Sequence, residues 1–301
     1  MMNSLESQVL ASVGKVSDPE LSKPLTELGM VGAINGSIEK FSVEIKLTVS
    51  HCPMKAELES LVKSTLALDF PNSEFHIDLT VMSKEELAKL KVKLRGHERT
   101  NPFLQSPTRV ILVGSGKGGV GKSTLTANLA VGLAKRGFKV GLIDADIFGF
   151  SLTKLMGTSS RPTRLDDMML PPTAFGVKLM SIGMFLDANE PVSWRGPMLH
   201  KAIEQFLSDV YWGDLDFLVI DMPPGTGDVS ISIGQLLPNA KYLVVSTPAS
   251  DASLVAARSA MAAFKSGQEI IGVVENFSWL ELPDNSKQYP FGVGGGESLA
   301  K

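Results

Sequence analysis

The sequence predicts an α/β fold in which a mostly parallel sheet with flanking helices follows a smaller α/β domain. Two observations indicate the sheet: from residue 109 onward short apolar runs alternate with segments of helical periodicity, and a glycine-rich segment follows the first run. Such alternation is typical of parallel strands covered by helices on both faces. The expected strands are 110–113, 140–143, 177–181, 217–220, 242–246 and 270–274.

Length and composition limit the class of protein. The 301 residues, 44% of them hydrophobic, suffice for about two domains. A net charge of -3 provides no basic field, so we expect no nucleic-acid partner. No run approaches the roughly 20 apolar residues of a membrane span. Because Met1–Glu6 also lacks the pattern of a leader peptide, we expect a cytoplasmic protein without a membrane partner.

The first 95 residues are expected to form the smaller domain. Alternating apolar and polar residues at 41–49 and 75–81 predict two half-buried strands, and helical spacing predicts a helix between them. A polar, proline-containing linker is expected at 96–108. The predicted division is therefore a domain at 1–95, a linker, and a nucleotide-binding domain at 109–301.

The single cysteine, Cys52, lies between the first of these strands and the helix that follows. One cysteine excludes an internal disulfide and any metal site that needs two thiolates from one chain. The positive end of the helix would lower the thiol pKa, which favours a reactive thiol or an iron-sulfur ligand. A small buried residue at a tight turn is the alternative, and position alone leaves both readings open.

Residues 116–124 match the phosphate-binding pattern G-x-x-x-x-G-K-S/T, between a predicted strand and a predicted helix as the pattern requires. The glycines let backbone N–H groups turn toward phosphates, Lys122 adds positive charge, and the Ser123 hydroxyl can bind Mg2+. The alternative is a turn that only joins a strand to a helix. The expected ATP-binding residues are Gly116, Gly118, Gly119, Val120, Gly121, Lys122, Ser123 and Thr124.

Three carboxylates follow predicted strands, at the edge where open α/β sheets bind ligands. Asp221 ends an apolar run and is expected to hold Mg2+ together with Ser123. Asp144 and Asp146 follow another run, and either could orient or deprotonate an attacking water. Each carboxylate taken singly could instead cap a turn or a helix.

The segment Lys117-Gly118-Gly119-Val120-Gly121-Lys122-Ser123, with its additional lysine, resembles the deviant Walker A loop of the MinD/ParA/Mrp ATPases. The resemblance implies a P-loop NTPase fold. It also implies that Lys117 reaches across a nucleotide-sandwiched homodimer to the phosphates of the partner, where it stabilises transition-state charge. Asn276 matches the family position that contacts adenine.

Further segments resemble the Mrp branch, the ATP-dependent iron-sulfur cluster carriers related to ApbC. They are Asp144-Ala145-Asp146-Ile147, Arg195-Gly196-Pro197-Met198 and the segment 221–228. The amino-terminal domain is similar to the small iron-sulfur assembly domain often fused to Mrp, through Asp18-Pro19-Glu20-Leu21 and the segment 48–53.

This resemblance implies a slow, Mg2+-dependent ATP hydrolase whose nucleotide state controls a homodimer. It further implies that the protein binds iron-sulfur clusters and transfers them to apo-proteins, with iron-sulfur assembly proteins and apo-protein acceptors as partners. The alternatives are a MinD/ParA-like switch for spatial positioning and a scaffold that binds ATP without hydrolysing it.

The sequence departs from the family pattern at three places, and the first concerns the ligands of the iron-sulfur cluster. Ser278–Gln288 contains no Cys-x-x-Cys pair, which in Mrp carriers supplies the ligands of a bridging cluster. Phe150 stands where the family usually has proline. The sequence ends at Lys301, where relatives continue into another strand and helix, so we expect a shortened relative.

Overall fold

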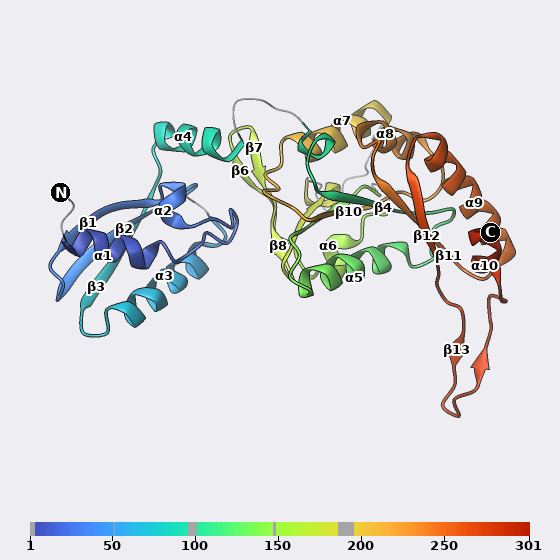
Figure 1. Cartoon of the computed structure of the whole chain (residues 1–301), viewed down its shortest axis with the longest axis horizontal. Coiled ribbons are helices and arrows are strands. Elements are labelled where there is room, and N and C mark those ends of the chain that lie inside the picture. Colours follow the sequence, from blue (N-terminus) through green and yellow to red (C-terminus); the bar gives the residue numbers. More distant parts are fainter. Residues whose placement is uncertain (1–3, 51, 96–100, 147–148, 186–195) are drawn as a thin grey trace. The chain divides into compact units, whose positions relative to one another are not determined.

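The computed structural model describes residues 4–50, 52–95, 101–146, 149–185 and 196–301 (Figure 1). The chain divides into two units. The first contains Met1–Arg99 together with Thr163–Leu170, and the second contains Thr100–Pro162 together with Pro171–Lys301.

The first unit is a three-stranded sheet with the order β1-β2-β3, packed against helices. Strand β2 lies in the centre and alternates exposed or half-buried residues with fully buried apolar ones, as the sequence predicts. It pairs antiparallel with β1 and parallel with β3, so α3 forms the crossover between β2 and β3. The elements are α1 Ser4–Val13, α2 Leu25–Leu28, β1 Val31–Gly36, β2 Lys40–Leu47, α3 Lys55–Asp69, β3 Glu74–Val81 and α4 Lys84–Arg95.

A short hairpin completes this unit, although its neighbours in sequence belong to the second unit. Strands β6 (Thr163–Leu165) and β7 (Met168–Leu170) pair antiparallel. Three of their apolar side chains are buried, and Lys91 of α4 forms ion pairs with Asp166 and Asp167 at 3.1 and 2.7 Å. The division predicted from the sequence left this hairpin in the domain at 109–301. Strands of three residues are too short to show a hydrophobic period.

The second unit contains a seven-stranded sheet with the order β12-β11-β4-β10-β5-β9-β8. All neighbouring pairs are parallel except β8 with β9, so the predicted fold class is confirmed. Helices α5 and α6 lie along one face of the sheet, and α7 and α8 along the other (Figure 1).

All six strands expected from the sequence are present. The elements of the second unit are η1 Pro102–Leu104, β4 Arg109–Ser115, α5 Lys122–Lys135, β5 Val140–Asp144, α6 Leu152–Leu155, β8 Thr173–Ala174, β9 Val177–Ser181, η2 Ile182–Phe185, α7 Gly196–Ser208, β10 Phe217–Asp221, α8 Asp228–Leu236, β11 Lys241–Ser246, α9 Ser250–Lys265, β12 Glu269–Glu275, β13 Leu280–Glu281, β14 Lys287–Gln288 and α10 Gly295–Ala300.

The register of the central strands brings the predicted site residues to one edge of the sheet. Asp221 at the end of β10 lies beside Val113 of β4 on one side and Asp144 of β5 on the other. Since β4 leads directly into the glycine-rich segment, this segment and the two carboxylates share the carboxyl edge. The fold therefore assembles the site that the sequence motifs indicate.

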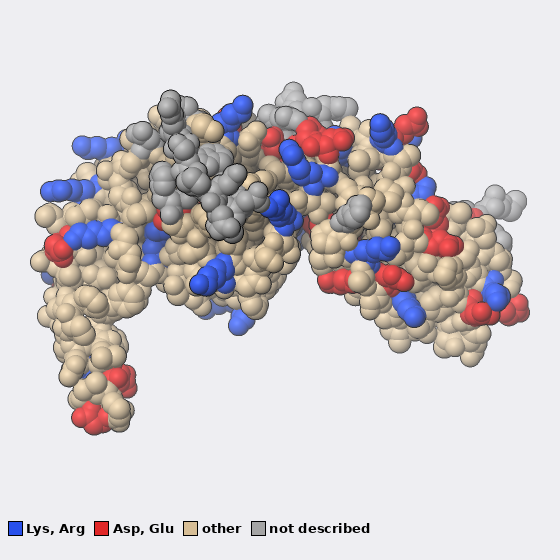
Figure 2. All heavy atoms as spheres, turned by 180° about the vertical axis from the view of Figure 1, so that it is seen from behind, with Lys and Arg blue, Asp and Glu red and all other residues tan. Residues whose placement is uncertain are grey.

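The surface carries charges of both signs. On the face drawn in Figure 2, basic and acidic side chains are interspersed over the first unit. Within the described part of the chain, no helix combines the length and apolar character needed to cross a bilayer.

Candidate functional site

The glycine-rich segment forms the connection between β4 and α5, and two of its glycines permit close approaches. Gly121 precedes α5 with φ of +81°, and a Cβ there would lie 2.2 Å from Nδ2 of Asn276. A Cβ on Gly116 would lie 2.3 Å from the backbone nitrogen of Ala256 in α9. The loop therefore keeps its shape only with glycine at both positions.

Replacing Gly116 by alanine is expected to destabilise the nucleotide-free protein. The added methyl group meets helix backbone, which moves only with the whole of α9, so we expect a loss of about 1–3 kcal/mol in the free energy of unfolding. Gly118→Ala is the matched control, because a Cβ at Gly118 meets no atom within 4 Å. Urea unfolding of both variants measures the difference. Equal stability of the two would contradict the packing of α9 against Gly116.

Asp221 is the centre of the site. Its carboxylate is fully buried and accepts hydrogen bonds from the Lys122 ammonium at 2.8 Å, the Ser123 hydroxyl at 2.5 Å and the Thr126 hydroxyl at 2.9 Å. Lys122 is also buried, so the two charges neutralise each other where water is excluded. The side chains of Lys122 and Ser123, which the sequence predicts to bind phosphate and Mg2+, are therefore bound to Asp221 in this structure.

The oxygen atoms at this point suit magnesium. Mg2+ prefers hard oxygen ligands and is commonly held by one or two protein groups together with water and phosphate. The Ser123 hydroxyl and the Asp221 carboxylate already lie within hydrogen-bonding distance of each other. The residues thus fit the magnesium role predicted for them.

Asp144 lies beside Asp221, and its oxygens are bound to protein. Oδ2 accepts the backbone N–H groups of Ser151 and Leu152 at 3.1 Å each and the hydroxyl of Ser181 at 3.2 Å. Burial, and next the charge of Asp221, raise the pKa of Asp144 to about 6. Asp144 thereby holds the start of α6.

Asp146 faces the phosphate loop more directly. Its Oδ2 lies 3.9 Å from the Lys122 ammonium, while Oδ1 accepts the N–H of Gly149 at 3.1 Å. Of the two carboxylates predicted to position water, Asp146 is the one that forms an ion pair with Lys122. Ile147, the next residue of this motif, lies outside the described residues.

Lys117 is bound within its own chain. Its ammonium forms an ion pair with Asp251 in the first turn of α9, and this contact lowers the pKa of Asp251. Both side chains are exposed, so the pair is open to solvent and salt. Asp251 was not predicted from the sequence.

Asn276 follows β12 and lies against the same loop. Its side-chain amide donates to the carbonyl oxygen of Val120 at 3.0 Å. Gly119 has φ of +80°, and a Cβ at Gly118 or Gly119 would meet open space. Of the predicted residues, 116–121 thus form the loop and 122–124 begin α5, with Asn276 at the side of the loop.

Thr126 is a further member of the site that sequence reasoning missed. It lies one helical turn after Lys122, and its hydroxyl lies 2.8 Å from the Lys122 carbonyl oxygen, so its single proton is shared between that oxygen and Asp221. The spacing of four residues on the helix after a phosphate loop was the available signal.

Cys52 belongs to the first unit, and the glycine-rich loop belongs to the second. The expected lowering of its pKa is wrong: burial, and next the carboxylate of Glu20, raise the thiol pKa to about 11. The helix position was visible in the sequence, whereas the acidic neighbour was not. Among the described residues no group of three or more His, Cys, Asp or Glu side chains could hold a metal ion, so iron-sulfur ligation by Cys52 stays a prediction.

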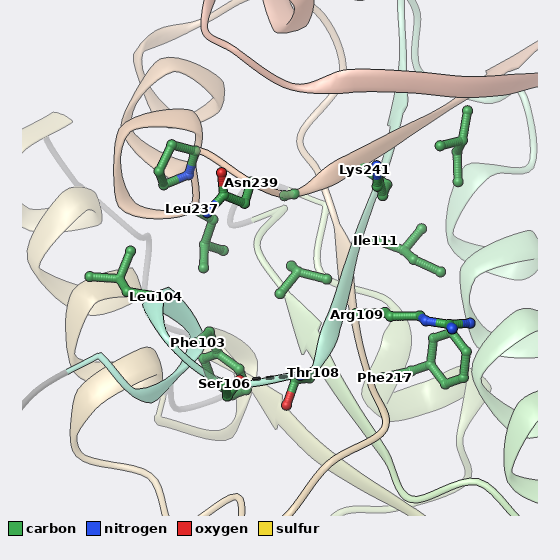
Figure 3. Close-up of a pocket in the computed structure, with 14 residues that line it drawn as sticks. Phe103, Leu104, Ser106, Thr108, Arg109, Ile111, Phe217, Leu237, Asn239 and Lys241 are labelled. Carbon is green, nitrogen blue, oxygen red and sulfur yellow. Dashed lines mark hydrogen bonds between the residues drawn. The ribbon is translucent and has the colours of Figure 1, made fainter.

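A separate cavity of about 430 Å3 opens at the opposite edge of the same sheet (Figure 3). Its walls include Phe103 and Leu104 of η1, Ile111 near the start of β4, and Phe217 at the start of β10, over whose ring lies Arg109. It contains none of the predicted site residues, because the loop follows the end of β4 and not its beginning.

Comparison with known proteins identifies the architecture. The family model described as NUBPL iron-transfer P-loop NTPase matches residues 106–301, and the model described as iron-sulfur cluster assembly protein matches residues 6–74. A solved structure of a nucleotide-binding protein in complex with ADP from Archaeoglobus fulgidus has a TM-score of 0.59 and 36% identity. The match covers 67% of this chain and 82% of that one.

Curated relatives match almost the whole chain. It is 51% identical to an iron-sulfur cluster carrier protein of Mycobacterium leprae (strain TN), over 99% of this chain and 79% of the relative. It is 40% identical to an iron-sulfur cluster carrier protein of Bacillus subtilis (strain 168), over 98% of this chain and 84% of the relative. The resemblance predicted from the sequence is thereby confirmed, and the chain belongs to the family of NUBPL iron-transfer P-loop NTPases, with an iron-sulfur cluster assembly domain at residues 6–74.

Proposed function

We propose that the protein binds and slowly hydrolyses ATP in the presence of Mg2+, and carries iron-sulfur clusters that it transfers to apo-proteins in the cytoplasm. The observation that carries this proposal is the convergence of Lys122 and Ser123 on Asp221, in a chain whose curated relatives are named iron-sulfur cluster carrier proteins. Iron-sulfur assembly proteins and apo-protein acceptors are the partners that this function requires.

In the proposed reaction the residues of the loop take over the phosphates. Lys122 leaves Asp221 and pairs with the phosphate oxygens, while the backbone N–H groups of 116–124 donate to them. Ser123 and Asp221 hold Mg2+, which neutralises charge on the phosphates. Asp146 orients the attacking water, and Asn276 exchanges its contact with Val120 for the adenine.

Nucleotide state is proposed to control a homodimer through Lys117. In the single chain this lysine is paired with Asp251. In the ATP-bound dimer it reaches the phosphates of the partner, where its positive charge stabilises the transition state. ATP binding and dimer formation therefore both favour the release of Lys117 from Asp251 and its contact with the phosphates of the other subunit.

The cluster is the cargo of the proposed reaction, and its binding is the step to test first. The sequence provides one cysteine per chain, so a two-fold dimer supplies two thiols where an all-cysteine site takes four. Reconstitution with iron and sulfide under anaerobic conditions should give protein-bound iron and sulfide in the native chain, and less in Cys52→Ala. Absence of a cluster from both proteins, with ATP hydrolysis intact, would contradict carriage by this chain and leave the ATPase proposal standing.

A further inference from the structure

The loop 222–227 joins the end of β10 to α8 and lies beside the start of the glycine-rich loop. The N–H of Gly225 donates to the carbonyl oxygen of Ser115 at 2.8 Å, and a Cβ on Gly225 would lie 3.9 Å from the carbonyl oxygen of Gly116. Asp221, the proposed magnesium ligand, directly precedes this β10–α8 loop. Gly225 therefore connects the β10–α8 loop to the backbone that leads into the nucleotide site.

A chain of hydroxyl groups holds the carbonyl oxygen of Gly225. The Ser259 hydroxyl of α9 donates to this oxygen at 3.3 Å, and the Tyr242 hydroxyl of β11 lies 2.9 Å from the Ser259 hydroxyl oxygen. The Ser230 hydroxyl is more distant, at 3.5 Å from the same carbonyl oxygen. A hydroxyl group has one proton, so Ser259, which donates to Gly225, accepts a hydrogen bond from Tyr242. The hydrogen bonds thus run from Tyr242 through Ser259 to Gly225.

This chain of hydroxyls is part of the core of the second unit. Tyr242 and Ser259 are both nearly completely buried. A Cβ on Gly114 of β4 would lie 1.7 Å from the Tyr242 hydroxyl oxygen, so glycine leaves the space that this hydroxyl occupies. Burial raises the pKa of Tyr242, so its hydroxyl keeps its proton and remains a donor. The packing therefore fixes the tyrosine hydroxyl where it can orient Ser259.

The helix that provides Ser259 also contacts the glycine-rich loop. The backbone nitrogen of Ala256, three residues before Ser259, would lie 2.3 Å from a Cβ on Gly116. In the first turn of the same helix, Asp251 forms the ion pair with Lys117. Helix α9 therefore supports both the glycine-rich loop and the β10–α8 loop.

We propose that Tyr242 and Ser259 are positioning residues for ATP hydrolysis, which fix the β10–α8 loop beside the glycine-rich loop by holding the carbonyl group of Gly225. Catalysis by a phosphate loop depends on accurate placement of backbone groups and Mg2+ around the phosphates. Neither hydroxyl contacts ATP in this account. The inference rests on the proposed ATP hydrolysis and does not require a bound cluster.

Phosphate release at varied ATP concentration tests this role. In Ser259→Ala we expect kcat to fall about tenfold, because a small displacement of groups that act in the transition state is costly. In Tyr242→Phe the fall should be smaller, about threefold, because Ser259 keeps its contact with Gly225 but loses the hydroxyl that orients it. KM should stay within about twofold of the native value in both variants, since the residues that bind the phosphates are unchanged.

Two further variants separate a positioning role from a general loss of packing. Ser259→Thr keeps the hydroxyl and should retain the native kcat, because a cavity of about 20 Å3 lined by Ser259 and Gly225 has room for the added methyl group. The double variant Tyr242→Phe with Ser259→Ala should have the kcat of Ser259→Ala alone, since Tyr242 acts only through Ser259.

Hydrogen exchange of the nucleotide-free protein measures the loop itself. The N–H of Gly225 is bonded to Ser115, and it should exchange faster in Ser259→Ala than in the native chain, because the loop has lost its hydroxyl donor from α9. An unchanged exchange rate would show that Ser259 does not hold the loop and would overturn the proposal.

Ser266→Ala is the matched control. Ser266 follows the last residue of the same helix, but its hydroxyl donates to the carbonyl oxygen of Ala262 in that helix at 3.0 Å. Its kcat should be native, and circular dichroism identifies any unfolded variant.

The possible failures of the proposal differ from one another. A native kcat in Ser259→Ala, a kcat as low in Ser259→Thr as in Ser259→Ala, or an equal loss in Ser266→Ala would overturn the positioning role. A double variant that shows the product of the two single losses would overturn the role of Tyr242. Absence of phosphate release from the native protein would refute the proposed ATP hydrolysis itself, and the inference with it.

Discussion

Replacing Lys122 by methionine is expected to lower ATP hydrolysis at least about a hundredfold. It should also destabilise the nucleotide-free protein by about 3–5 kcal/mol, because it leaves a buried carboxylate without its counter-charge. Lys122 is nearly completely buried, and its contact with Asp221 lies in the centre of the sheet edge. Phosphate release and urea unfolding measure the two effects separately.

The double variant Lys122→Met with Asp221→Asn is the control that separates catalysis from stability. Ser123 and Thr126 donate to different oxygens of Asp221, so asparagine can accept one hydroxyl with its oxygen and donate to the other with its NH2 group, while it removes the unpaired charge. The double variant should therefore recover much of the lost stability and remain inactive. A double variant no more stable than Lys122→Met would show that the ion pair does not determine the stability of this site.

Lys117→Ala is expected to reduce phosphate release at least about a hundredfold while it leaves ATP affinity nearly unchanged. In the single chain Lys117 is exposed and binds Asp251, so the loop does not depend on it for its shape. Its proposed contact with the phosphates of the partner is strongest in the transition state, so the loss should appear mainly in kcat. Phosphate release under saturating ATP, together with direct nucleotide binding, measures both quantities.

Asp251→Asn tests the proposed role of Lys117 by weakening the ion pair that holds this lysine in the single chain. Asparagine can still accept the N–H of Ala252, which Asp251 accepts at 2.9 Å, but it no longer holds the ammonium by charge. Sedimentation in the presence of ATP should show dimers at a lower protein concentration than for the native chain. Native phosphate release in Lys117→Ala would refute the role of this lysine across the dimer.

Periodic features of the sequence predicted the fold. Six apolar runs predicted six of the seven strands of the large sheet, and the alternation in 41–49 predicted β2, because burial on one or both faces imposes a visible pattern. The hairpin at 163–170 has two strands of three residues and shows no such pattern. Its packing in the first unit depends on tertiary contacts.

The residues of the candidate site could be predicted where they belong to a local sequence motif. The loop 116–124 and Asp221 follow from strand, glycine and carboxylate positions. The pairing of Lys117 with Asp251 and of Glu20 with Thr163 joins residues more than a hundred positions apart, which one sequence does not reveal. The raised pKa of Cys52 has the same origin, because Glu20 reaches the thiol only after folding.

The structure of the protein with Mg2+ and a non-hydrolysable ATP analogue tests the nucleotide site most directly. The account predicts the triphosphate on the backbone of 116–124, the Lys122 ammonium on phosphate instead of Asp221, and Lys117 of one chain at the phosphates of its partner. Nucleotide bound elsewhere, or Lys122 still paired with Asp221 in the loaded protein, would contradict it.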